Sequence, residues 1–295
     1  MAGEITLSNT AILMDLSITS GAVDIRVEDV PLFDPAAPIS ASQTLDTQFS
    51  INQAFHPGEN TMTFRVRFTP SSDPVVNPSL NVAIGAYTGT SWPSIGESRP
   101  LVSDFKIRPA STPDGGYLLE VKEHHSEQEA LRAGELVHIS GDGTPESWNT
   151  YRLIFKVDLP LPEFAWQQGQ SLSATPDTEQ SLAAEYQRLL HVLAQKDRAL
   201  YRQALWPFLR NMAAAQGLDT EAYAAMSLDP VLGPESEYDP VPYSAARSRV
   251  ELFGGGRLAA LVPIPLKFRH REWDDEATLF IYFWKDQTGQ WQIIH

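Results

Sequence analysis

The sequence contains no cysteine, so disulfide bonds, thiolate metal sites and cysteine nucleophiles are all excluded. It also lacks any uninterrupted run of about 18 apolar residues, and no membrane insertion is expected. Residues 1–9 show neither the basic start nor the apolar stretch of a secretory signal. These absences favour a cytoplasmic protein, and a periplasmic protein whose signal has been trimmed would share them.

Positive charge is in short supply as well. The 295 residues include 22 Lys and Arg against 37 Asp and Glu, and the formal net charge is −15. An acidic surface repels phosphate groups, which argues against nucleic acid and anionic lipid as partners. A protein partner or a small apolar ligand is compatible with it, and so is a surface that is merely solvated. The length suffices for two domains.

Residues 10–160 alternate between apolar and polar positions in short runs separated by Gly, Pro, Asn and Asp. Ile12–Ile18 and Val23–Val27 alternate most clearly, and Ser20–Gly21 between them predicts a tight turn and a hairpin. About eight or nine short strands of this kind are typical of an antiparallel β-sandwich or jelly roll. We therefore expect an antiparallel β-sandwich domain over residues 1–165.

Part of this half resembles bacterial jelly-roll accessory domains. Val23–Val30, then Ile51–Gln53, then Pro57–Asn60 before a long strand match their pattern of short strand, extended linker and Pro-Gly-Glu-Asn turn. The physical content lies in the turn, since Gly58 can take a positive φ and Asn60 tolerates the left-handed region. The resemblance implies a fold and no activity.

The second half has a different pattern. Residues 166–178, rich in Gln and Ser, are expected to form a linker. Apolar residues at helical spacing follow, with Asp177 as the predicted N-cap. A second helix is expected to bend or to give way to a turn at Pro207, and Asp219 caps a short third helix. Strand-like runs then close the chain, so residues 179–295 have the order of an α+β domain.

Two segments, Leu189–Asp197 and Tyr282–Ile293, resemble the NTF2-like (SnoaL-like, cystatin-related) superfamily. Its members commonly end in a strand, a Lys/Asp–Gly turn and a final strand of the form Gly-x-Trp-x-Ile. The resemblance implies a conical α+β fold whose sheet wraps around a pocket. That fold hosts isomerases, dehydratases, cyclases, transport factors and pure binding domains, so it selects no activity. The superfamily's enzymes share no motif that maps onto this sequence, and no catalytic position is carried over.

The densest group of titratable residues is His270–Glu276. In it, His270 with Asp274 or Asp275 could supply a general base and an orienting acid. A solvated loop between strands is the simpler interpretation. Aromatic side chains could instead line an apolar pocket, or simply pack in the core. The candidates are Trp206, Tyr223, Tyr282 and Trp284.

Other features carry weaker chemical signals. His124–His125 lies among glutamates, but neighbouring residues of a strand point to opposite faces, so neither a metal site nor a cofactor is predicted. Asp142–Glu146 lacks the alternating oxygen ligands of a calcium loop, and a turn is expected. His295 would lie near a cone mouth or at a mobile chain end. Three tryptophans could stack on sugar rings if they are exposed: Trp92, Trp148 and Trp166.

These patterns favour a non-catalytic bacterial binding or interaction protein that holds a protein or small ligand in the cone pocket or on a sheet face. A secretion-system accessory or immunity protein is one setting for it. The alternative is an isomerase or cyclase that uses the cone as its active site. Phe280, Tyr282 and Trp284 alternate with apolar residues and predict a second aromatic face on the last sheet. The N-terminal domain or a second copy would cover that face, and the oligomeric state stays open.

Overall fold

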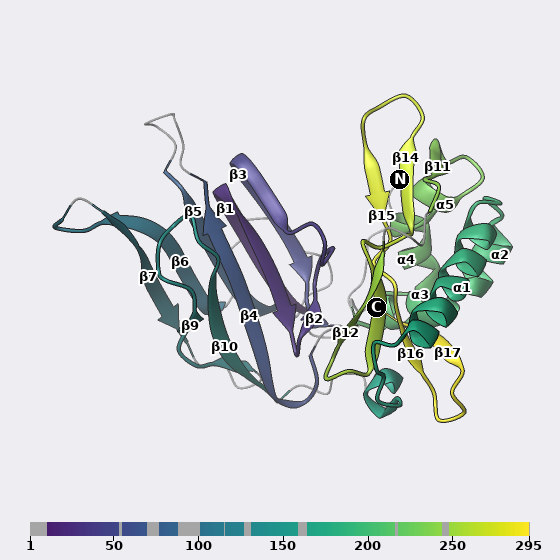
Figure 1. The fold of residues 1–295 in the computed structure, drawn as a ribbon, viewed down its shortest axis with the longest axis horizontal. Helices are drawn as coiled ribbons and strands as arrows, with labels where there is room; N and C mark the ends of the chain where they lie inside the picture. Colours follow the sequence, from purple (N-terminus) through teal and green to yellow (C-terminus); the bar gives the residue numbers. More distant parts are fainter. Residues whose placement is uncertain are drawn as a thin grey trace. The chain divides into compact units, whose positions relative to one another are not determined.

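The computed structural model describes residues 11–52, 55–69, 77–87, 101–114, 116–126, 131–158, 164–215, 218–243 and 248–294. Antiparallel β-structure dominates, and the helices lie in the second half of the chain, which confirms this part of the expectation (Figure 1). The chain divides into two compact units. The first comprises Met1–Phe33 and Pro38–Leu161, and the second comprises Asp34–Ala37 and Pro162–His295.

The described part of the first unit forms one ten-stranded sheet in which every strand pair is antiparallel. The main path of the sheet runs β7–β6–β5–β1–β4–β10–β8, with β2 and β3 attached to β1 and β9 attached to β10. The strands are β1 Ala11–Val27, β2 Val30–Pro31, β3 Ile39–Ser50, β4 Gly58–Phe68, β5 Ser79–Tyr87, β6 Leu101–Ser111, β7 Tyr117–His125, β8 Leu131–Ala133, β9 Val137–Ser140 and β10 Asn149–Val157.

Strand β1 is 17 residues long and changes its partner half way along. Its first part pairs with β5 and its last part with β4, while β3 pairs across the junction. At Ser20, whose φ is +46°, the register with β3 shifts between Thr19 and Gly21. The apolar face therefore moves from even positions such as Ile18 to odd positions such as Val23, and both stay in the core. The predicted hairpin is wrong, because the change of parity marks a bulge within one strand.

This change of partner lets a single sheet enclose one core. Phe64 of β4 and Phe105 of β6 are not on neighbouring strands, yet their ring centroids lie 4.9 Å apart in an edge-on contact. Phe55 and Phe155 meet in the same way at 5.9 Å. Each fully buried side chain of this size contributes about 1.5–3 kcal/mol to folding. The inner face thus closes through one continuous sheet.

The turn before β4 keeps only part of its predicted chemistry. Gly58 has a φ of +99°, as expected. Asn60, however, lies in the strand and is fully buried. Its amide oxygen accepts the His56 N–H at 2.9 Å, and its NH₂ group donates to the carbonyls of His56 and Gly58 at 2.8 and 3.1 Å. Asn60 therefore does not use the left-handed conformation that it could tolerate at this position. It closes the loop through its side chain instead.

In the second unit, helices precede two small antiparallel sheets, β11–β14–β15 and β12–β13–β16–β17. None of the helices in the described ranges is both long enough and apolar enough to cross a membrane. The helices are η2 Ala165–Gln168 (a 3₁₀ helix), α1 Pro176–Leu193, α2 Arg198–Ala204, α3 Trp206–Ala215, α4 Thr220–Ser227 and α5 Asp229–Leu232. The strands are β11 Tyr238–Pro240, β12 Arg249–Phe253, β13 Leu258–Val262, β14 Lys267–His270, β15 Glu276–Thr278, β16 Tyr282–Lys285 and β17 Trp291–Ile294.

Helix starts agree with the sequence in part. Asp219 caps α4 as predicted, by accepting two backbone amides at 2.9 and 3.1 Å. Helix α1 starts earlier than predicted: Thr175 is its N-cap and Pro176 takes the first position, where a missing N–H costs nothing. Asp177 lies in the first turn, where its charge favours the helix dipole. Pro207 is the second residue of α3, so the predicted second helix restarts there.

Part of the last sheet is covered from within the second unit. Residues 277–285, whose sequence has the pattern of a single strand, are divided between β15 and β16. Tyr282 is fully buried, and its ring centroid lies 5.4 Å from that of Phe253. Trp284 is half-buried beside Gly169, where an added Cβ would stand 2.9 Å from its ring. Residues 164–172, largely predicted as linker, bond to this sheet through the Gln170 and Leu172 amides at 2.9 and 2.8 Å. The second unit therefore supplies part of this cover from its own chain.

Candidate functional site

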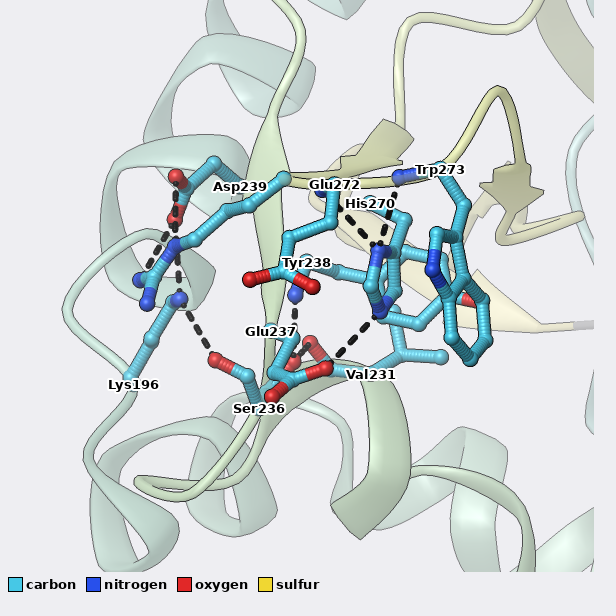
Figure 2. Close-up of polar contacts among 10 residues, drawn as sticks. Lys196, Val231, Ser236, Glu237, Tyr238, Asp239, His270, Glu272 and Trp273 are labelled. Carbon is cyan, nitrogen blue, oxygen red and sulfur yellow. Dashed lines mark hydrogen bonds and ion pairs between the residues drawn. The ribbon is translucent and has the colours of Figure 1, made fainter.

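His270 lies at the end of β14 and is only 7% exposed (Figure 2). Its Nε2 atom is 2.9 Å from a carboxylate oxygen of Glu237. Its Nδ1 atom is 3.2 Å from the backbone nitrogens of both Glu272 and Trp273. Two N–H donors require a lone pair on Nδ1, so the ring carries its proton on Nε2 and donates it to Glu237. Both ring nitrogens are thereby occupied, and neither is open to act as a base.

Two aromatic side chains also pack against the ring of His270. Trp273 stacks on the imidazole with the ring centroids 4.6 Å apart, and Tyr238 meets it edge-on at 5.1 Å. Asp274 and Asp275, the predicted partner acids, are both exposed. The Asp275 carboxylate accepts the Tyr238 hydroxyl and raises the pKa of that phenol. The imidazole partner is instead Glu237, which is 33 positions away in sequence and reaches it through the β11–β14 pairing.

A second set of charges adjoins this cluster (Figure 2). Lys196 Nζ lies 2.8 Å from Asp239, and Arg271 approaches both carboxylate oxygens of Asp239 at 3.0 Å. These cations hold the pKa of Asp239 far below its ordinary value. Lys196 also donates to the Ser236 carbonyl at 3.0 Å. Asp239 pairs with both cations, so these contacts fasten the turn between α1 and α2, which carries Lys196, to β11 and β14.

The four aromatic candidates come from different elements. Trp206 begins α3 and is 45% exposed, whereas Tyr223 of α4 is buried, which raises the pKa of its hydroxyl. Tyr282 packs on Phe253, and Trp284 lies beside η2. Their role in ligand binding stays a prediction.

The sugar-stacking interpretation gains no support from Trp148 and Trp166, the two of its three candidates that the structure describes. Arg65 and Arg67 lie over the ring of Trp148 at 4.7 and 4.9 Å from its centroid. Trp166 is buried, with its ring against Gly254. Trp92 and His295 lie outside the described residues. The ring of Trp148 is therefore already in contact with two cations.

The structure also describes the histidine pair, His124–His125, and the acidic loop, Asp142–Glu146. His125 Nε2 lies 2.9 Å from Glu123, and no group of three potential ligands is placed to hold a metal ion within the described ranges. Asp142 accepts the amide and hydroxyl of Thr144 and the hydroxyl of Ser147, which lowers its pKa. This is the expected turn.

A groove of about 400 Å³ lies in the second unit between helices α1 to α3 and strands β16 and β17. Phe283, Trp291 and Ile293 give it an apolar side. Arg188 is the only charged residue among the described residues of its lining. The lining offers neither a carboxylate nor an imidazole, so this groove suits binding of an apolar group better than acid–base chemistry.

A larger groove, about 540 Å³, lies on the outer face of β3, β1, β5, β6 and β7; we call it the sheet groove. Its floor consists of short side chains of β5, Asn81 and Ala83. Strand register places Asp15 and Asp104 on either side of Ala83. In the next row of cross-strand neighbours, two positions away on β5, Asn81 pairs with Lys106 of β6, and Lys106 pairs with Lys122 of β7.

The two lysines of the sheet groove are direct cross-strand partners, and like charges in this position destabilise an antiparallel pair. The next outward pair on the same strands is matched, because Arg108 and Glu120 approach to 2.8 Å. Lys122 also lies 3.8 Å from Glu120. The Lys106–Lys122 pair therefore weakens the sheet, and Glu120 offsets part of this cost at Lys122.

Searches of protein-family models, of curated proteins and of solved structures found no match for the chain. The geometry of its own residues is therefore the basis for assigning a function.

Proposed function

We propose that the protein is a non-catalytic binding protein that holds its ligand or partner in the sheet groove. The observation that carries this proposal is a groove of about 540 Å³ with a floor of short side chains and walls that bear charges of both signs. Side chains on a paired sheet are held at fixed spacing, so such a face recognises a partner without needing to reorganise. The unfavourable lysine pair supports the proposal, since a bound acidic group would relieve it.

The finer fold assignments belong to the same proposal. We propose an NTF2-like fold for residues 179–295, supported by the turn at Gly289, whose φ is +82°, and by the final strand that follows it. A jelly-roll-like sandwich is proposed for the first unit, supported by the Phe64–Phe105 contact between non-neighbouring strands. A bacterial interaction protein, such as a secretion-system accessory or immunity protein, is the setting we favour.

The alternative function is a small-molecule isomerase or cyclase that uses the second unit. Its groove favours an apolar ligand, because Trp291 and Phe283 line it. Catalysis there would need an acid or base near the ligand, and the described lining residues provide neither. We therefore rank this function second.

Co-purification from the native host tests the proposal. The wild-type chain is compared with Ala83→Trp, which fills the floor of the sheet groove, and with Ile154→Trp at an exposed position of β10 outside it. We expect a partner that the wild type and Ile154→Trp retain and that Ala83→Trp loses. A partner held equally by all three chains would contradict the site. A clean monomer that turns over a small molecule would contradict the function.

A further inference from the structure

We infer that the sheet groove binds an extended peptide segment that carries a basic and an acidic side chain two residues apart. This inference rests on the proposed function and adds the chemistry of the bound partner. Its basis is the arrangement of charges in two neighbouring rows across the sheet.

The first row suits a basic side chain. Asp15, Ala83 and Asp104 are consecutive cross-strand neighbours on β1, β5 and β6. Neighbouring strands are about 4.8 Å apart, so one carboxylate stands on each side of a methyl group. The stem of a Lys or Arg side chain can lie on Ala83 while its cation reaches both carboxylates. Gln48 donates to one oxygen of Asp15 at 2.8 Å, and the cation would join the partners that this carboxylate already has.

The second row suits an acidic side chain. Asn81, Lys106 and Lys122 are consecutive neighbours on β5, β6 and β7. A carboxylate placed between the two ammonium groups replaces their repulsion with two charge-assisted hydrogen bonds. The amide of Asn81 adds a donor on the floor beside them.

The spacing of the rows matches an extended chain. Ala83 and Asn81 lie two positions apart on β5, which is about 6.4–6.8 Å along a strand. Side chains i and i+2 of an extended peptide lie on one face at this same spacing. A peptide lying along β5 therefore places one side chain over each row. Because the chain can lie in either direction, both Lys-x-Glu and Glu-x-Lys fit.

Two other ligand classes fit the groove less well. A sugar needs an aromatic platform, but Phe105, the one aromatic residue among the described lining, is buried in the core. A polyanion would meet four acidic residues of the lining beside the two lysines: Asp15, Asp46, Asp104 and Glu123. A segment of mixed charge complements both rows.

The test measures binding of labelled peptides to the full chain by fluorescence polarisation. Three peptides share one Thr-rich host sequence and differ only in carrying Lys-x-Glu, Lys-x-Lys or Glu-x-Glu. We expect the mixed peptide to bind about tenfold more tightly than either of the others, and salt to weaken it. Equal affinity of the three peptides would overturn the inference.

Charge-reversal variants make the test independent of folding defects. Asp104→Lys should shift the preference toward Glu-x-Glu, and Lys106→Glu should shift it toward Lys-x-Lys. Lys156→Glu, an exposed change on β10 outside the groove, serves as the control and should leave the preference unchanged. An exchange of preference cannot arise from partial unfolding. Preferences that ignore both groove variants would overturn the inference.

Other outcomes separate this inference from the proposed function. If no peptide binds while Ala83→Trp still loses the co-purified partner, the groove is a binding site for another chemistry and the inference fails alone. If sedimentation shows a wild-type dimer that Ala83→Trp dissociates, the bound partner is a second copy, which also overturns the inference. If the partner is retained by Ala83→Trp, both fail.

Discussion

Two charged clusters in this protein differ in how completely their groups are matched. Around His270 in the second unit, each ring nitrogen has a partner, and Asp239 lies between two cations. In the sheet groove of the first unit, Lys106 faces Lys122 across the strands, and Asp15 and Asp104 flank a methyl group. Matched groups stabilise a fold, whereas like charges placed together weaken it. The high density of titratable residues in the sequence around His270 therefore identified a structural cluster.

The largest expected effect comes from removing the imidazole. His270→Ala leaves a cavity, two backbone amides without an acceptor and Glu237 without its donor. We expect a loss of about 2–4 kcal/mol in the unfolding free energy. Urea denaturation measures it. His124→Ala, an exposed change in the sheet groove, should cost less than about 0.5 kcal/mol. Equal losses in the two variants would remove the distinction between the clusters.

A second prediction concerns the packed segment that covers the last sheet. Gly254 has a φ of +57°, and a Cβ there would stand 2.7 Å from the ring of Trp166. Gly255 has a φ of +64°, and a Cβ there would make only an ordinary contact with the Arg257 side chain at 3.8 Å. Gly255→Ala should cost about 1–2 kcal/mol for its left-handed backbone alone. Gly254→Ala adds about 1–3 kcal/mol for the clash. Thermal unfolding that ranks both variants equally would show that Trp166 moves aside freely.

The third prediction is a gain in stability rather than a loss. Lys106→Gln removes one charge of the like-charge pair and leaves the ion pair between Lys122 and Glu120 in place, so the unfolding free energy should rise by about 0.2–1 kcal/mol. The same change should weaken binding of the mixed-charge peptide. Arg152→Gln, exposed on β10 with Thr63 and Val137 as its cross-strand partners, controls for the loss of a surface cation. A variant that loses both stability and binding would indicate that the pair is structural.

The smallest expected effect is on pH dependence. Arg271 and Lys196 lower the folded pKa of Asp239, so the unfolded chain takes up its proton first as the pH falls. The stability that this carboxylate contributes is present above the unfolded pKa of about 3.9 and is lost as the pH falls below it. Asp239→Asn should therefore flatten the acid end of a stability–pH curve, measured by urea midpoints. Asp46→Asn on β3 is the control. A steeper acid limb in Asp239→Asn would contradict the ion-pair assignment.

Local rules predicted much of the fold. Alternation identified the strands around Phe64 and Phe155, and the preference of Asp for N-caps and of Gly for positive φ located Asp219 and Gly58. Local rules failed where two structures share one pattern. A hairpin and a bulge both interrupt alternation, and at Ser20 only the pairing with β3 and β4 distinguishes them.

The sheet groove could not be found from the sequence because its residues lie on strands far apart in the chain. Alternation places Asp15, Ala83 and Lys106 on outward faces, but it does not say which strands are neighbours or in which register. The partner of His270 was missed for the same reason, since Glu237 reaches it through a strand pairing over 33 positions. Long-range register carries this information, and composition does not.

The most direct test asks which of the two clusters contacts a ligand. Methyl-labelled alanine allows both to be followed by NMR in one titration of the full chain with the Lys-x-Glu peptide. Ala83 reports on the floor of the sheet groove, and Ala277 of β15 pairs with β14 next to the His270 cluster. We expect the Ala83 methyl signal to shift and saturate while the Ala277 signal does not shift. A shift of Ala277 with Ala83 unmoved would contradict it.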